Sequence, residues 1–273
     1  MGSSREAGGD IEEDHKAFLM INGKKVVATI EARMTSTRLS KKVLLPLAGK
    51  PVLAHMIERH KRSTYTDEVV VATTTNATDD PIVLLCEEMQ CSYFRGSEED
   101  VLGRIVAAGG KYKADILVQG MADSPMVDWR IVDRLIQELD TGGYDCATNE
   151  FESEDAFPVG FDMRVYAFPV LRKSAEVDQD PALREHAGYS VRSQPEKFKL
   201  FYWEAEGDMH WPALRLTLDT KEDFQLISAV YDELYPKNPD FSAEDVVAFL
   251  KTRPDLVAIN THVVQRDPSK VSY

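Results

Sequence analysis

The stretch from Val26 to Arg59 reads VVATIEARMTSTRLSKKVLLPLAGKPVLAHMIER and passes from one secondary-structure pattern to another. Its first residues form an uninterrupted apolar run, which is typical of a strand in a parallel sheet covered on both faces. From Pro51 onward the apolar residues have helical spacing, and a proline near a helix start costs little. Residues 33–42, between the two, carry four cations and no acid. We therefore expect a strand at 25–32, a helix at 49–63 and a strongly basic connection.

The same alternation of apolar run and amphipathic stretch continues to residue 143. Three further pairs of expected strand and helix are 67–75 with 80–90, 91–97 with 98–112, and 114–123 with 128–143. Four such repeats predict an α/β protein with a doubly wound, Rossmann-like, mostly parallel twisted sheet and helices on both faces.

The second half of the chain has a less regular pattern. Strands are expected at 145–151, 160–168, 196–207 and 212–220, and helices at 169–177, 221–236 and, opened by Ser242, at 241–260. Neither a low-complexity linker nor a repeat of fixed period separates the two halves. We predict a flexible N-terminal tail, residues 1–24, followed by a single domain, residues 25–273, with inserted strands and a C-terminal helical extension.

The composition limits the classes of partner. The chain has 273 residues and a formal net charge of −14, a balance whose long-range field repels nucleic acid and anionic membranes. Its odd number of cysteines, without CxxC spacing, argues against a disulfide framework or a zinc site. No apolar run reaches the ~20 residues of a membrane span, and the N-terminus lacks the pattern of a signal peptide. A cytoplasmic location is expected.

Phosphate binding is one interpretation of the basic connection. Arg33, Arg38 and Lys42 offer the forked and point-charge donors that suit phosphate oxygens, and the hydroxyls of residues 35–37 add further donors. The alternative is a solvated basic loop whose cations pair with acids elsewhere in the fold. The Walker pattern GxxxxGK[ST] is absent, so the residue types alone leave both interpretations open.

Two aspartates follow apolar strands in separate loops. Asp123 ends the expected strand 114–123, and Asp219 lies at the end of the expected strand 212–220. Ligands of open α/β sheets bind outside the carboxyl ends of the strands, and Mg²⁺ takes one or two carboxylates together with phosphate oxygens and water. The two aspartates are therefore candidates for a shared metal site. The alternative is that they cap the following helices, as is expected of Asp128.

The second half adds polar residues without a recognition code. The stretch LREHAGYSV places Arg184, Glu185 and His186 in a row, and PVGFDMRV places Asp162 close to Arg164. The histidine is a candidate general base or substrate contact, whereas Arg184 and Glu185 could equally form a surface ion pair. Asp162 either binds hydroxyls of a polar ligand or pairs with a neighbouring arginine.

Taken together, these motifs resemble those of a known family. From about Val26 to Tyr235 the chain is similar to cytidylyltransferases of the spore-coat polysaccharide biosynthesis type, which are related to the enzymes that make CMP-sialic acid and CMP-Kdo. The similarity is carried, in order, by EARMTSTRLSKKVLLPLAGKPVLAHMIERHKRS, VVVATTTNATDDPIV, FRGSEEDVLGR, ADSPMVD, LREHAGY and LRLTLDTKEDFQLISAVYDEL. Such an ordered run is far more specific than any one of its members.

The resemblance implies a Rossmann-like nucleotidyltransferase fold and, as the reaction, Mg²⁺-dependent transfer of CMP from CTP to a sugar acid or related acceptor. Pyrophosphate leaves, and the product serves surface glycoconjugate biosynthesis. A homodimer is also implied. The implied catalytic residues are Arg33, Lys42 and Asp123. The implied nucleotide-binding residues are Ala32, Arg33, Ser36, Arg38, Lys42, Thr74, Asn76, Gly96 and Ser97. The implied acceptor-binding residues are Asp162, Glu185 and His186, and the implied metal ligands are Asp123 and Asp219.

The chain departs from the usual pattern of the family near the implied nucleotide site. Glu31 stands where Gln is common, and Gln119 stands where Arg is frequent. Thr35 and Ala122 replace glycines, which removes two positions of unusual backbone freedom. Two alternatives therefore stay open: a sugar-phosphate nucleotidyltransferase that uses another nucleotide, and a non-catalytic relative that binds a nucleotide sugar or a partner.

Overall fold

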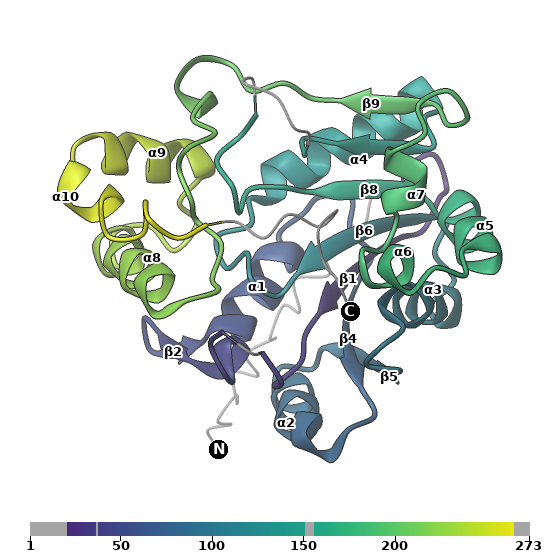
Figure 1. Ribbon diagram of the computed structural model, residues 1–273, viewed down its shortest axis with the longest axis horizontal. Coiled ribbons are helices and arrows are strands. Elements are labelled where there is room, and N and C mark those ends of the chain that lie inside the picture. The colour runs from purple at the N-terminus through teal and green to yellow at the C-terminus, as the bar shows by residue number, and fades with distance from the viewer. Residues whose placement is uncertain (1–20, 37, 151–155, 265–273) are drawn as a thin grey trace, which may run out of the picture.

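A computed structural model describes residues 21–36, 38–150 and 156–264 of the chain. Within these ranges, one seven-stranded sheet forms the centre of the molecule (Figure 1). Its strands lie in the order β5 (Ser92–Gly96), β4 (Glu68–Thr74), β1 (Val26–Glu31), β6 (Ile116–Met121), β8 (Arg164–Ala167), β7 (Cys146–Thr148) and β9 (Leu200–Tyr202). A small hairpin pairs β2 (Pro46–Leu47) with β3 (Lys50–Pro51).

Helices cover both faces of the sheet. The first half contributes α1 (Val52–Lys61), α2 (Asp80–Glu88), α3 (Val101–Lys111) and α4 (Trp129–Gly142). The second half contributes α5 (Phe168–Val177), α6 (Pro181–Glu185), α7 (Tyr189–Arg192), α8 (Lys221–Leu234), α9 (Ala243–Lys251) and α10 (Pro254–Val257). Short 3₁₀ turns are η1 (Lys42–Leu44), η2 (Ala77–Asp79) and η3 (Gly207–Met209). None of the described helices is both long enough and apolar enough to cross a membrane.

The apolar run of β1 accounts for the two-sided architecture. Successive side chains of a strand point to opposite faces, so Val26, Ala28 and Ile30 join the core formed with α1, α4, α8 and α9. Val27 joins the second core, on the α3 and α5 face. Both neighbours of β1, β4 and β6, run parallel to it. The predicted doubly wound parallel sheet with its four strand–helix repeats is therefore confirmed.

The inserted strand β8 is antiparallel to both of its neighbours, β6 and β7. Gln119 of β6 lies opposite Arg164 of β8 in this pairing. Because the two strands run in opposite directions, the start of β8 lies at the carboxyl end of β6. The residues just before β8, including Asp162, are thereby brought to the edge where the parallel strands end.

The expected strand 212–220 is wrong. Its alternating leucines, Leu214, Leu216 and Leu218, are buried as expected of an extended segment. Within the described part of the chain, however, its only β-pairing is an isolated bridge between Val159 and Arg215. The bridge rests on Val159 N to Leu214 O, 2.9 Å, and Leu216 N to Val159 O, 2.7 Å. The alternating burial was predicted correctly, but the segment does not pair as a strand of the sheet.

Other elements of the second half differ in length. The expected strand 196–207 contracts to β9, since the chain turns into η3 soon after Trp203 N bonds to Thr148 O. The expected strand 160–168 contracts to β8, because Gly160 has φ +110° and Phe161 N bonds back to Pro158 O. The expected strand 145–151 is β7, with residue 151 outside the described ranges.

The C-terminal extension is two helices rather than one. Pro254 starts α10 after a break, because a proline disfavours helical backbone in the residue before it. Ser242 caps α9 in a capping box with Asp245, as predicted. Asp128 caps α4 by accepting from Arg130 N and, through its other oxygen, accepts from Ala243 N at 2.7 Å. One carboxylate thus ties α9 to α4, and α9 and α10 lie beside α8 (Figure 1).

The division of the chain at residue 24 stays a prediction. Residues 1–20 lie outside the described ranges, and Ile21 and Lys24 form an isolated bridge just before β1.

Candidate active site

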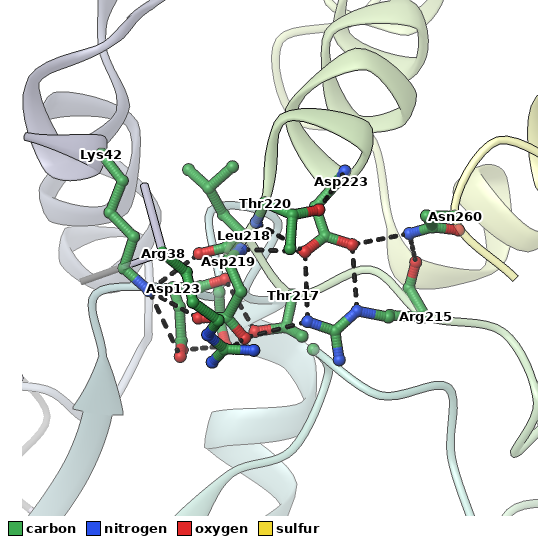
Figure 2. Close-up of polar contacts among 12 residues, drawn as sticks. Arg38, Lys42, Asp123, Arg215, Thr217, Leu218, Asp219, Thr220, Asp223 and Asn260 are labelled. Carbon is green, nitrogen blue, oxygen red and sulfur yellow. Dashed lines mark hydrogen bonds and ion pairs between the residues drawn. The ribbon is translucent and has the colours of Figure 1, made fainter. Parts of the chain in front are cut away.

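The candidate site lies at the carboxyl ends of β1 and β6, where connections leave the sheet in opposite directions. Ligands of open α/β folds bind at such a switch point. The basic loop, residues 33–42, leaves β1 here, and Asp123 follows β6. Figure 2 shows Arg38 and Lys42 of the basic loop beside the carboxylates of Asp123 and Asp219.

Lys42 lies between these two carboxylates. Its Nζ is 2.9 Å from Asp219 Oδ1 and 3.8 Å from Asp123 Oδ2, and it donates to Leu218 O at 2.8 Å. The lysine side chain is 13% exposed, so water screens these contacts only partly. The ammonium is the link between two acids that are 96 residues apart in sequence, at positions 123 and 219.

The second oxygen of Asp219 binds two arginines. Asp219 Oδ2 lies 2.9 Å from a guanidinium nitrogen of Arg38 and 2.9 Å from one of Arg215. Burial by itself raises the pKa of Asp219, but Lys42, Arg38 and Arg215 together lower it, and the net shift is downward. Asp219 is therefore an ionised carboxylate surrounded by three cations.

A buried network behind Asp219 fixes its position. Arg215 donates to both oxygens of Asp223, at 2.9 and 3.1 Å, and Asn260 donates to Asp223 Oδ1 at 2.9 Å. Asp223 in turn accepts from the backbone N–H groups of Asp219 and Thr220. Thr220, not Asp219, caps α8, so the alternative role of Asp219 as a helix cap is wrong. The sequence carried a signal for this, because Thr220 and Asp223 have capping-box spacing.

Backbone contacts bring Asp123 to the same place. Asp123 O accepts from Leu218 N at 2.7 Å and from the Thr217 hydroxyl at 3.2 Å. Asp123 does not cap α4, since Asp128 does. The two aspartates that the sequence suggested as metal ligands are therefore neighbours held by the backbone of residues 217–219.

This donor set fits a divalent cation that arrives with phosphate groups. Mg²⁺ binds through one or two carboxylates and completes its shell with phosphate oxygens and water. Asp123 and Asp219 are two carboxylates flanking one positively charged atom. Across the described residues, His, Cys, Asp and Glu side chains form no group of three or more suited to a metal. Further ligands would therefore come from the substrate and from water.

Glu98, which was not predicted from the sequence, connects its own loop to the basic loop and to the loop after β4. Its Oε1 accepts from the Thr35 hydroxyl at 2.5 Å and lies 3.3 Å from Arg33, while its Oε2 accepts from the Asn76 amide at 2.5 Å. From α3, Arg104 donates to the backbone carbonyls of Ser97 and Glu98. Three cations of the basic loop thus do pair with acids elsewhere in the fold: Arg33 pairs with Glu98, whereas Arg38 and Lys42 pair with the aspartates of this site.

Other residues implied to bind the nucleotide have different positions. Ala32 and Thr74 are buried, and the Thr74 hydroxyl donates to Asp79 at 2.5 Å. Asp79 also accepts from Met34 N, so it anchors the start of the basic loop. Gly96 O accepts from Thr75 N, and Ser97 Oγ accepts from Asp100 N. Ser36 is half-buried, and residue 37 lies outside the described ranges.

Glu31 and Gln119, two of the residues that depart from the family pattern, contact each other. The Gln119 amide donates to Glu31 Oε1 at 2.6 Å across the paired strands β1 and β6. Burial raises the pKa of Glu31, against the opposing effects of Gln119, Arg104 and Arg164. The two residues that depart from the family pattern therefore form one polar pair at the end of β1, just before the basic loop.

Asp162, one of the implied acceptor-binding residues, lies close to this pair, because Gln119 is paired with Arg164 at the start of β8. Asp162 Oδ2 accepts from Gly160 N at 3.1 Å. Burial, reinforced by the negative charges of Glu150 and Asp123, raises the pKa of Asp162 to about 7. Arg164 forms a two-pronged ion pair with Glu150. This aspartate is therefore a carboxyl group that titrates near neutrality.

The suggested ion pair between Arg184 and Glu185 is wrong. Arg184 instead donates to both oxygens of Asp100, at 3.0 and 2.7 Å, which joins α6 to the start of α3. The reason is geometric, because adjacent helical residues do not face each other.

His186 belongs to a cluster with unused polar atoms. Within the described part of the chain, His186 Nε2, Tyr166 Oη and one terminal nitrogen of Arg192 are buried without a hydrogen-bond partner. Arg192 also lies 3.5 Å from Glu150. Gly188 has φ +76°, and a Cβ there would lie 2.3 Å from Tyr166 Oη. Burial lowers the pKa of His186, which favours the neutral ring. Glu150, Tyr166 and Arg192 have no sequence signal, because their partners are distant in the chain.

Comparison with known proteins gives a consistent family. A sequence profile described as Cytidylyltransferase matches residues 27–245. The spore coat polysaccharide biosynthesis protein SpsF of Bacillus subtilis is 32% identical over 237 residues, which cover 84% of this chain and 95% of that protein. An uncharacterized protein of Methanocaldococcus jannaschii is 32% identical over 247 residues, which cover 90% of this chain and 99% of the relative.

Solved structures agree with these relatives. A cytidylyltransferase from Leptospira borgpetersenii has a TM-score of 0.80 at 31% identity, covering 89% of this chain and all of that one (100%). A CMP:2-keto-3-deoxy-manno-octonic acid synthetase complexed with CTP shares the fold, with a TM-score of 0.57 at 20% identity, covering 77% of this chain and 99% of that one. The chain therefore belongs to the cytidylyltransferase family, with SpsF among its relatives, and is an enzyme of the nucleotidyltransferase class.

Proposed function

We propose that the protein transfers CMP from CTP to a sugar acid, with Mg²⁺ as cofactor and pyrophosphate as the second product, for the biosynthesis of a surface glycoconjugate. The observation that carries this proposal is the meeting of the basic loop with Asp123 and Asp219 at the switch point of the sheet. Cations and metal-type ligands in one place are what a triphosphate substrate requires.

The basic loop would bind the triphosphate. Negative charge develops on the leaving phosphates during phosphoryl transfer, so fixed cations around them lower the barrier. Arg33, Arg38 and Lys42 all belong to one short loop and would supply that positive charge. Mg²⁺ held by Asp123 and Asp219 would supply Lewis-acid stabilisation to phosphate oxygens.

The cluster at β8 favours an acidic acceptor. Arg164 and Arg192 share the single carboxylate of Glu150, which leaves one positive charge in excess among these three. His186 and Tyr166 add polar atoms without partners, and native proteins rarely leave such atoms unused. A sugar acid supplies both a carboxylate for the excess charge and hydroxyls for the neutral groups.

Asp162 would accept the proton of the acceptor. As the acceptor hydroxyl oxygen bonds to the α-phosphorus of CTP, the bond from that phosphorus to the β-phosphate oxygen breaks and its electrons leave with pyrophosphate. The hydroxyl proton must go to a base, and a carboxyl group whose pKa is near the working pH is suited to that task. Asp162, with a pKa of about 7 and a position just before β8, would be that group.

The test is a pyrophosphate-release assay in Mg²⁺. CTP is combined with a panel of sugar acids, neutral sugars and sugar 1-phosphates, and each set is repeated with UTP, GTP and ATP. We expect release only with CTP and a sugar acid. Release with a sugar 1-phosphate and another nucleotide would instead establish the sugar-phosphate nucleotidyltransferase alternative.

A further inference from the structure

We infer that Lys42 holds the place of the divalent cation between Asp123 and Asp219, so that metal and nucleotide bind together by an exchange of ion partners. The inference rests on the proposed function for the identity of the nucleotide. In the absence of phosphate groups, the Lys42 ammonium stays between the two carboxylates and excludes the metal. When phosphates bind, the ammonium pairs with them instead. Lys42 would then set the order of binding as well as contact the triphosphate.

Lys42 occupies the position between the two carboxylates. The Lys42 ammonium lies 2.9 Å from one carboxylate and 3.8 Å from the other, and it is itself only partly exposed (Figure 2). A cation held by both Asp123 and Asp219 needs the space that this ammonium fills. The carbonyl of Leu218 holds the ammonium there at 2.8 Å. The lysine and the metal therefore compete for one position.

The charged side chains of this cluster balance one another. The carboxylates of Asp123, Asp219 and Asp223 face three cations, which are Arg38, Lys42 and Arg215. These six charges sum to zero, so a divalent cation added alone leaves the cluster with an excess of positive charge. A triphosphate added alone withdraws cations from the aspartates and places their charges beside its own. Either ligand alone is disfavoured by like-charge repulsion.

Arg215 is held more firmly than the two cations of the basic loop, Arg38 and Lys42. Arg215 is buried and bonded to both oxygens of Asp223, and Asp223 is bonded to Asn260, so Arg215 stays with the acids. Arg38 and Lys42 come from the basic loop, and their side chains are 29% and 13% exposed, against 8% for Arg215. When both ligands arrive, these two cations pass to the phosphates, and the metal takes the released carboxylates. The two affinities are then coupled, and the coupling is reciprocal.

The test uses Mn²⁺ alone, without nucleotide, because a metal–nucleotide complex in solution would also produce apparent coupling. Free Mn²⁺ is measured by electron paramagnetic resonance during titration of the wild type and of Lys42→Met. We expect Lys42→Met to bind one Mn²⁺ roughly tenfold or more tightly than the wild type, since a positive charge has left the site. Asp123→Asn in the Lys42→Met background should remove the gain.

Two controls separate this effect from a general change of charge. Lys41→Met removes the neighbouring, exposed lysine of the same loop and should leave Mn²⁺ affinity unchanged. Lys42→Arg keeps the positive charge and should remain as weak a metal binder as the wild type. If Lys42→Met melts early, Lys42→Gln gives a neutral polar variant with the same expectation.

Equal Mn²⁺ affinity of wild type and both neutral Lys42 variants would overturn the inference. That result is distinct from failure of the proposed function, which would appear as absent pyrophosphate release from CTP in the wild-type enzyme. Tighter Mn²⁺ binding by Lys41→Met as well would also overturn it, because the effect would then come from net charge rather than from the position of Lys42.

Discussion

Asp162 shows how the surroundings of one carboxyl group change its chemistry. It lies just before β8, accepts one backbone N–H group, and has a pKa raised to about 7 by burial and by the charges of Glu150 and Asp123. Asp219, which is buried in the same site, has its pKa lowered by the net effect of three cations. Under the proposed function, their different neighbours suit Asp162 to proton transfer and Asp219 to cation binding.

Replacement of this group gives a prediction about turnover. Asp162→Asn should lower kcat about 100-fold or more, the usual contribution of a positioned general base, while the KM for CTP changes little. Initial rates of pyrophosphate release at varied CTP and acceptor measure both constants. Asp232→Asn, an exposed aspartate on α8, is the matched control and should keep full activity. A normal kcat in Asp162→Asn would show that another group takes the proton.

Residue-scale prediction from sequence succeeded where strand ends define position. Arg38, Lys42 and Asp123 could be expected to lie close together, because they follow the neighbouring parallel strands β1 and β6. Asp219 was expected at the end of a strand 212–220 that the described sheet does not contain, and it reaches the site because Thr217 and Leu218 bond to the carbonyl of Asp123. The residues that hold these side chains in position were not predicted from the sequence. Glu98 and Arg192 act through partners that only the folded chain brings near, and no local pattern marks them. The spacing of Asp223 from Thr220 indicates its part in the helix cap, but not its bonds to Arg215 and Asn260.

At the scale of the element, α1 presents an unusual residue to the sheet. His60 is fully buried, and within the described part of the chain neither of its ring nitrogens has a hydrogen-bond partner. Gly120 of β6 leaves room for the ring, since a Cβ at that position would lie 2.7 Å from His60 Nε2. Burial, helped by Arg59, lowers the pKa of His60 to about 4.

This histidine predicts a loss of stability in mild acid. Its folded pKa is below its unfolded value, so as the pH falls from about 6.5 to about 4 the unfolded chain takes up a proton that the folded chain refuses. The contribution is present above the unfolded pKa and is lost across this window, by up to about 3 kcal/mol. Urea unfolding at several pH values measures the loss.

His60→Leu should flatten this part of the pH dependence, whereas His262→Leu, at an exposed position, should not. Equal slopes for the wild type and His60→Leu would mean that other groups cause the acid sensitivity.

Elements with long periodic patterns were predicted well, and short ones were not. The continuous apolar runs of β1, β4 and β6 required burial on both faces, which only a covered parallel sheet provides. The helices α6 and α7 have five and four residues, too few for a helical period to appear in the sequence. The leucines of 212–220 predicted an extended chain, but nothing in that stretch names Val159 as its partner.

At the scale of the whole molecule, ligand binding should appear as a gain in thermal stability. A ligand that binds only the folded state at 100 times its dissociation constant adds about 2.7 kcal/mol. For a protein of this size we expect CTP with Mg²⁺ to raise the Tm by roughly 5–10 °C. Differential scanning fluorimetry with CTP, UTP, GTP and ATP, each with and without Mg²⁺, measures the shifts. A larger shift with another nucleotide would change the assigned donor, and no shift with any would contradict nucleotide binding.

Assembly of the chain into a homodimer stays a prediction. The irregular strands of the second half are its expected interface, and β9 forms one edge of the sheet there. Sedimentation of the purified protein measures the state directly.

The hydrogen bond from Asn260 to Asp223 has a consequence for synthesis on the ribosome. The basic loop is made within the first fifth of the chain, yet the aspartate that faces it is held through Asp223, which bonds to a residue near the other end. A nascent chain that has emerged only as far as α8 carries every residue of the basic loop and lacks the amide that bonds to Asp223. The support of Asp219 is therefore complete only after residue 260 has been made, long after the basic loop.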